Sequence, residues 1–290
     1  MEDIPTGEPN SWKSLSSMAR RVEELGFDTL WFADELLWKV PKWPGPRGFW
    51  EAATLAGALA VTTKTVKLGS WVFSALHRNP ALTVRMAETL DEISGGRFIL
   101  GFGSGHAGNR SFGYPADHIV TRYEEALQIV IPMLRKGEAD FTGRYHRVEE
   151  LPNHPRGPRP AQIPLMLAGN GPRTIGLAVR YGDIWSALAD GDSRPQAFVE
   201  PMRIVNDACL EQGRDPSSLK KSASVWVGAG SMAEGSQSPF GEMLSGDPGR
   251  LAEAAHEFAE LGFTSLEFGL VPESLGSLEA VGRVVELLDT

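Results

Sequence analysis

The strongest constraint on the fold is a regular alternation of short apolar runs with amphipathic segments. The apolar runs, which predict strands, span 28–34, 66–73, 97–102, 163–169, 183–188, 222–230 and 265–270. The amphipathic segments, which predict helices, span 14–25, 50–63, 80–94, 121–135, 172–181, 196–212, 249–261 and 277–288. Strands that are apolar along their length must be covered on both faces, so this order predicts an α/β fold with a parallel sheet.

Seven strand and helix pairs after an unpaired helix favour a TIM (β/α)8-type barrel with its first strand missing or degenerate. The opening residues, MEDIPTGEPN, are too polar and proline-rich to predict that strand, so it is degenerate, the barrel is gapped, or the true start lies upstream. An open doubly wound sheet uses the same alternation and is the alternative. We expect one domain over 1–290, with a hairpin-bearing excursion at 137–162 and a possible lid loop at 228–248.

Composition narrows the class of partner. The net charge of −9 argues against nucleic acid and anionic membranes as partners, which leaves small molecules or proteins. Cys209 is the single cysteine, so no internal disulfide is possible, as expected for a reducing cytoplasm. The chain has no run of 18 apolar residues and no signal-like start, so we expect a soluble, cytoplasmic protein.

The segment GSGHAG, residues 103–108, matches the glycine fingerprint of dinucleotide-binding folds, but its context does not. It is followed by NRSFGYPADH, which predicts a loop and lacks the required helix and the acidic residue further on. In a strand, Gly101, Gly103 and Gly105 share one face, opposite the aromatic side chains. We expect that face to point at the barrel axis near the carboxyl-terminal mouth and to leave room for a flat ligand. Alternatively, the glycines only relieve crowding inside the barrel.

Several long segments resemble one enzyme family in the order of its motifs. They are ARRVEELGFDTLWFADEL, MAETLDEISGGRFILGFGSGH, FGYPADHIVTRYEEALQIV, GRYHRVEE and LMLAGNGPRTIGLAVRYGDIW. Together they resemble the bacterial-luciferase-like superfamily, particularly its F420-dependent oxidoreductases, from about residue 12 to 185. The resemblance implies a (β/α)8 barrel that binds FMN or the deazaflavin F420 at its carboxyl-terminal mouth.

The resemblance also implies which residues bind the cofactor. A cis peptide that does not precede proline is expected in the third strand, at Trp71–Val72, behind the tricyclic ring. The loop 169–171 is expected near the cofactor tail, where a helix N-terminus favours phosphate, with Arg173 adding a charge. Alternatively, Arg173 is a solvated helix cation. The full set of expected contacts is Ser70, Trp71, Val72, Gly103, Ser104, Gly105, Gly169, Asn170, Gly171, Arg173 and Thr174.

The same family resemblance implies which residues take part in acid–base catalysis. The family's sugar-phosphate dehydrogenases place a histidine after the second strand and a glutamate after the fourth, and here the matching positions are Glu35 and His106, with the residue types exchanged. We expect His106 and Glu35, helped by Asp34, to be the catalytic acid–base residues, because hydride transfer at a carbonyl or imine needs a proton donor or acceptor. In the alternative, these side chains only hydrogen-bond locally or face solvent. The other histidines show no metal-ligand spacing, and no metal is expected.

The function predicted from these features is hydride transfer between F420 and a small organic substrate. One alternative is a reduced-FMN monooxygenase supplied by a separate flavin reductase. A second is a flavin-binding barrel without catalysis, which the missing first strand makes plausible. The resemblance also implies a homodimer formed through barrel helices.

Overall fold

The alternation of helices and strands is present in a computed structural model, which describes residues 10–38, 46–105, 107–229 and 241–288. The helices are α1 (Trp12–Glu24), α2 (Ala52–Thr62), α3 (Pro80–Ser94), α4 (Ile119–Lys136), α5 (Pro172–Tyr181), α6 (Val199–Glu211), α7 (Pro248–Leu261) and α8 (Leu275–Leu288), with short 3-10 helices η1 (Ala107–Phe112), η2 (Pro195–Phe198) and η3 (Pro216–Ser218). The strands of the main sheet are β1 (Thr29–Phe32), β4 (Lys67–Ser70), β5 (Phe73–Ser74), β6 (Phe98–Gly103), β9 (Leu165–Ala168), β10 (Ile184–Leu188), β11 (Lys220–Gly228), β12 (Leu244–Ser245) and β13 (Ser265–Val271). Two small antiparallel hairpins pair β2 (Leu37–Trp38) with β3 (Arg47–Gly48) and β7 (Glu138–Thr142) with β8 (Arg147–Pro152).

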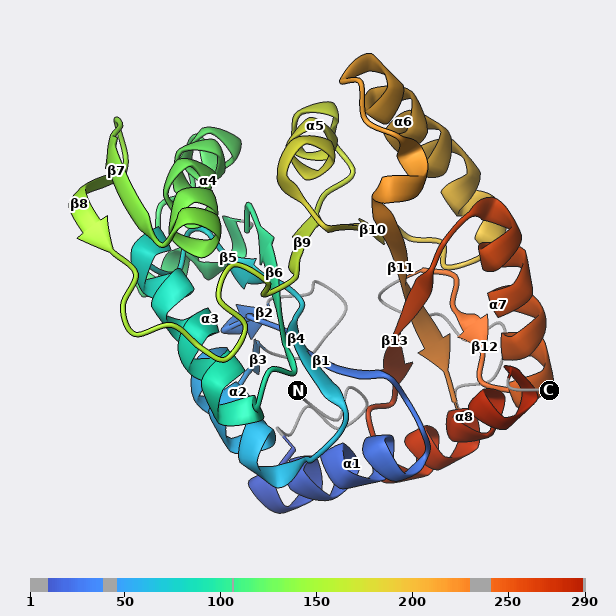
Figure 1. Ribbon diagram of the computed structural model, residues 1–290. Helices are drawn as coiled ribbons and strands as arrows, with labels where there is room; N and C mark the ends of the chain where they lie inside the picture. Colours follow the sequence, from blue (N-terminus) through green and yellow to red (C-terminus); the bar gives the residue numbers. More distant parts are fainter. Residues whose placement is uncertain (1–9, 39–45, 106, 230–240, 289–290) are drawn as a thin grey trace.

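The main sheet is parallel and curls around the interior of the molecule. Its strand order is β1-β4-β6-β9-β10-β11-β13, with β5 beside β6 and β12 beside β11. The helices form an outer layer around the strands (Figure 1). This arrangement confirms the prediction of a TIM-type barrel, here a curled half-barrel, and the doubly wound alternative is wrong. None of the helices in the described part of the chain is long and apolar enough to cross a membrane.

The two end strands of the sheet, β1 and β13, are not hydrogen-bonded to each other among the described residues. In an eight-stranded barrel the first strand would lie between them. Helices α1 and α8 pack together across this opening (Figure 1) through Met18, Val22 and Leu278. Arg21 of α1 also pairs with Glu279 of α8 at 2.6 Å. The expected missing strand falls on residues 1–9, which lie outside the described residues.

The glycines of β6 allow close approach of the neighbouring strand. A Cβ atom on Gly101 would lie 1.9 Å from the carbonyl oxygen of Ser70, and one on Gly103 would lie 2.6 Å from Val72 Cγ2. On the opposite face, Phe102 packs against Tyr123 of α4, with ring centroids 5.5 Å apart. The expectation that Gly101 leaves room for a ligand is therefore corrected, because the adjoining backbone already takes that space.

The predicted lid loop at 228–248 is described only at its two ends. Residues 230–240 lie outside the described residues. At the far end of the loop, β12 pairs with β11 in parallel, placing Leu244 opposite Val227. The loop therefore leaves the carboxyl end of β11 and returns to the same edge.

Candidate functional site

A cavity of about 550 Å³ lies at the carboxyl ends of the parallel strands. Its polar wall comes from segments that follow β1, β5, β6 and β9, because parallel strands all deliver their carboxyl ends to one side of the sheet. The cavity continues between β1 and β13 to the apolar side chains of α1 and α8, including Met18 and Leu278. Most of the lining is apolar, with a few polar groups, as is typical of small-molecule sites.

Aromatic and glycine residues form one wall of this cavity. The Trp71–Val72 peptide bond is cis, as the family resemblance predicts. The indole of Trp71 lies edge-on to that of Trp226, with ring centroids 6.2 Å apart, and both residues line the cavity. Gly103 and Gly105 line it as well, with Val72 and the Ser74 hydroxyl packed on the side where their Cβ atoms would lie. This wall suits a flat aromatic ring such as that of a flavin or deazaflavin.

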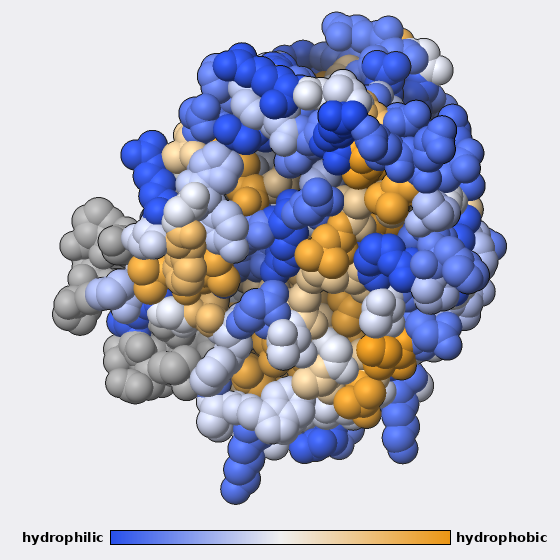
Figure 2. Space-filling model, turned by 90° about the vertical axis from the view of Figure 1, so that its left-hand side faces the viewer, coloured by the Kyte–Doolittle hydropathy of each residue, from blue (hydrophilic) through white to orange (hydrophobic). Residues whose placement is uncertain are grey.

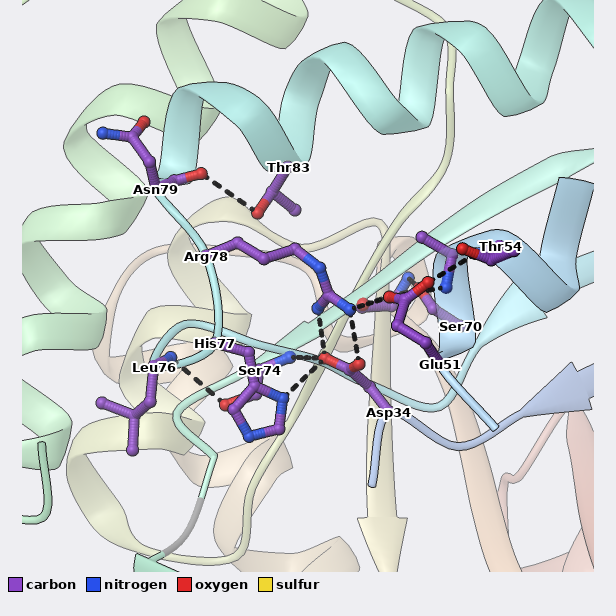
Figure 3. A network of polar contacts seen from close by, with 12 residues as sticks. Asp34, Glu51, Thr54, Ser70, Ser74, Leu76, His77, Arg78, Asn79 and Thr83 are labelled. Carbon is purple, nitrogen blue, oxygen red and sulfur yellow. Dashed lines mark hydrogen bonds and ion pairs between the residues drawn. The ribbon is translucent and has the colours of Figure 1, made fainter. Parts of the chain in front are cut away.

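A buried carboxylate, Asp34, stands at the centre of the polar network beside the cavity (Figure 3). Arg78 donates to both of its oxygens, at 2.5 and 2.8 Å. The backbone N–H of Ser74 donates to Oδ2 at 2.9 Å, and His77 Nδ1 lies 3.2 Å from the same oxygen. Arg78 reaches on to Glu51 at 2.7 Å, the residue that caps α2. The network therefore ties the loop after β1 to the loop after β5.

The network keeps its carboxyl groups ionised. Burial acts to raise the pKa of Asp34, but hydrogen bonds from His77, Arg78 and the Ser74 N–H outweigh it and lower the pKa. Burial likewise acts to raise the pKa of Glu51, while hydrogen bonds from Thr54 and Arg78 lower it to about 2. Asp34 is thus a fixed, charged acceptor with both oxygens occupied, rather than a carboxylate open to solvent.

Some of the predicted site residues line the cavity, and others lie outside it. Those that line the cavity are Asp34, Glu35, Trp71, Val72, Gly103, Ser104, Gly105, Gly169 and Asn170. Those outside the lining are Ser70, Gly171, Arg173 and Thr174. Ser70 instead bonds to β6, donating to the Gly101 carbonyl at 2.8 Å. The predicted catalytic His106 lies outside the described residues.

At the start of α5, the polar side chains bond to neighbouring residues rather than standing as unpaired exposed charges. The Asn170 amide donates to the Leu188 carbonyl at 2.9 Å, which joins the loops after β9 and β10. Arg173 is paired with Glu124, and the Thr174 hydroxyl donates to the Gly171 carbonyl at 2.9 Å. Because Gly171 at the N-cap provides no side-chain cap, the first-turn N–H groups remain the anion-binding feature of this end.

A second polar cluster, which the sequence reasoning missed, lies inside the sheet. The Ser224 hydroxyl is 2.5 Å from Glu267 Oε2 and accepts from the Trp71 indole at 2.8 Å, and Ser186 Oγ lies 3.1 Å from Ser224 Oγ. Glu267 is 4% exposed, and burial raises its pKa. A glutamate within the apolar run 265–270 was the available signal.

His77 is another cavity-lining residue that the sequence reasoning passed over. The available signal was its place directly after a strand at the active face. No group of three or more His, Cys, Asp or Glu side chains that could hold a metal ion occurs in the part of the chain that the structure describes.

Comparison with known proteins gives consistent matches. The sequence model of the family described as "Luciferase-like monooxygenase" matches residues 2–262. Pyrimidine monooxygenase RutA of Bradyrhizobium sp. is 32% identical over 68% of this chain and 56% of its own length. Phthiodiolone/phenolphthiodiolone dimycocerosates ketoreductase of Mycobacterium tuberculosis is 30% identical over 74% of this chain and 60% of its own length. The chain thus spans less than two thirds of these relatives.

Solved structures show the same fold. An F420-dependent secondary alcohol dehydrogenase in complex with an F420-acetone adduct superposes with a TM-score of 0.77 at 20% identity, covering 94% of each chain. At this identity the match establishes the architecture of the curled sheet and its helices.

Proposed function

This chain belongs to the luciferase-like monooxygenase family, and from that premise we propose that it is an F420-dependent oxidoreductase acting on a small organic substrate. The reaction we propose is hydride transfer to a carbonyl carbon, or from the corresponding alcohol. Bound F420 would supply or accept the hydride at C5 of its deazaflavin ring.

The observation that carries this proposal is the cavity at the carboxyl ends of the strands. Its volume of about 550 Å³ falls in the range of small-molecule sites. Trp71, Val72, Gly103 and Gly105 line one wall of it, where a planar ring can pack against aromatic and aliphatic surface. The apolar remainder of the cavity suits an organic substrate and excludes bulk water from the reacting atoms.

Two of the compared proteins support carbonyl chemistry. One is named a ketoreductase, and the other is an F420-dependent secondary alcohol dehydrogenase. Both names describe interconversion of a carbonyl and an alcohol. We assign the same reaction class to this chain, since its cavity offers both an apolar interior and a polar network at one end.

Within this proposal several of the predicted residues have a physical role. The N–H groups at the start of α5 bind a phosphate of the cofactor tail, and Asn170 holds that loop against Leu188. Glu35, which lines the cavity, and His106 are the acid–base candidates that the family resemblance implies. Asp34, with both oxygens occupied, positions its neighbours.

A second candidate function is oxygenation with reduced FMN supplied by a separate flavin reductase. The specific observation in its favour is the 32% identity to a pyrimidine monooxygenase. The cofactor decides between the two, since deazaflavin lacks the N5 atom through which reduced flavin handles oxygen.

The first experiment is a fluorescence titration with F420 and, separately, with FMN. We expect saturable F420 binding, weakened about tenfold in an Asn170→Ala, Arg173→Ala double variant, which corresponds to ~1.4 kcal/mol. Arg203→Ala, on the exposed face of α6, is the matched control and should bind as the wild type does. Preference for FMN would favour the monooxygenase. Binding of neither cofactor would contradict the proposal and favour a non-catalytic barrel.

We further propose that the protein is a homodimer formed through α2 and α3. Figure 2 shows apolar side chains among polar ones on the face that carries these helices. Trp50, which precedes α2, Val61 of α2, and Leu82 and Ile93 of α3 are exposed. A second copy of the chain is the partner that the family resemblance implies, and a shared apolar face suits a two-fold interface.

A further inference from the structure

His77 is a cavity-lining histidine for which the reaction described so far has no role. Its side chain is only 4% exposed, and its Nδ1 lies 3.2 Å from Asp34 Oδ2. The ring stands in the loop between β5 and α3, and the ring nitrogen Nε2 is turned away from Asp34 (Figure 3). The residue therefore combines contact with the cavity and attachment to a buried carboxylate.

Asp34 determines which nitrogen of His77 carries the fixed hydrogen. An ionised carboxylate can only accept hydrogen bonds, so the Nδ1 position must donate. Arg78 and the Ser74 N–H hold the carboxylate in place and ionised, so it cannot rotate away from the ring. Proton exchange is thereby confined to Nε2, as in other histidines oriented by an acidic residue.

The surroundings of the ring place it among the predicted site residues. The Ser74 hydroxyl, at the end of β5, would lie 2.1 Å from a Cβ atom on Gly105, so the end of β5 packs directly on the segment that follows β6. The Tyr114 ring lies 4.9 Å from the imidazole, between centroids, and limits its motion. His77 is therefore held between the loop after β1 and the loop after β6.

We propose that His77, in place of the Glu35 and His106 pair that the family resemblance implies, is the proton donor to the substrate oxygen in carbonyl reduction, and the proton acceptor in alcohol oxidation, with Asp34 as its positioning residue. This inference rests on the proposed F420-dependent function. In reduction, the carbonyl carbon would gain hydride from reduced deazaflavin and its π electron pair would move to oxygen, while the Nε2–H bond of the His77 imidazolium, which carries hydrogen on both ring nitrogens, breaks as its proton passes to that oxygen. The products are the alcohol, oxidised deazaflavin and neutral His77, which regains a proton from solvent.

The kinetic test compares His77→Asn with His256→Asn, a matched control on the exposed face of α7. Both are assayed with reduced F420 and whichever of acetone and longer methyl ketones the wild type reduces best. Asparagine retains a donor for Asp34 but cannot transfer a proton. We expect kcat to fall about 100- to 1,000-fold in His77→Asn, with KM and F420 affinity within about twofold of the wild type. Unchanged kcat would overturn the role of His77 alone, whereas a wild type that binds no F420 or reduces no ketone would overturn the proposed function and this inference with it.

A readout independent of turnover uses nitrogen NMR of the wild-type protein labelled at its histidine rings. The His77 signals are identified by their loss in His77→Asn. We expect the neutral form of the ring, which is the form that accepts the proton, to carry its hydrogen on Nδ1, and we expect a change in the Nε2 signal when F420 is added. A neutral form with hydrogen on Nε2 would overturn the inference.

Discussion

Glu267 shows at the scale of one residue what burial does to a charge. Its carboxyl group is buried, and the hydroxyl of Ser224 is the short contact that satisfies Oε2. Burial raises its pKa above the unfolded value of about 4.3. As pH rises above that value the unfolded chain releases the proton first, so this residue lowers stability progressively until its folded pKa is passed. We expect Glu267→Gln, which stays neutral, to gain stability relative to the wild type between pH 5 and pH 8, measured by urea unfolding.

Glu253→Gln on the exposed face of α7 is the control, because it removes the same charge without removing a buried carboxyl group. A Glu267→Gln protein whose stability difference from the wild type is the same at both pH values would contradict a raised folded pKa.

Two glycines show how an element depends on its neighbours. Gly101 lies in β6, where a Cβ atom would come within 1.9 Å of the Ser70 carbonyl, so the two strand backbones would have to separate. We expect Gly101→Ala to lower the free energy of unfolding by about 3 kcal/mol or more, measured by chemical denaturation. Gly57 lies in the middle of α2, and a Cβ atom there meets nothing within 4 Å. Gly57→Ala should therefore raise stability by up to about 1 kcal/mol, and similar losses in both variants would show that the strand contact is not the cause.

At the scale of the whole molecule, the exposed apolar side chains of the outer helices determine whether two copies of the chain associate. Val61 is 74% exposed near the end of α2, and Ile93 is 45% exposed near the end of the neighbouring α3. We expect native mass spectrometry to show a dimer, and a Val61→Asp, Ile93→Asp variant to shift it to monomer, because charge on this face opposes its burial. Leu210→Asp, on exposed α6, should leave the dimer intact. A wild-type monomer, or a dimer unaffected by both changes, would refute the proposed interface.

The order of strands and helices could be determined from the sequence alone, because apolar periodicity is a local property of the chain. The predicted helix 172–181 is α5, and the predicted run 66–73 is β4 and β5, interrupted at the cis bond. The same local reasoning placed Asp34 and Gly103 at the carboxyl ends of strands, and the family resemblance pointed to Trp71; all three line the cavity.

Which residues distant in sequence contact one another was decided only by the tertiary structure. Asp34 meets Arg78 and His77, Arg173 meets Glu124, and Glu267 meets Ser224. These contacts depend on strand register and on the curl of the sheet, which no local pattern records. The sequence therefore determined which residues reach the mouth of the barrel, while the fold decided which of them are held by a partner and which stand at the cavity, since a side chain's chemistry depends on the neighbours that the fold brings to it.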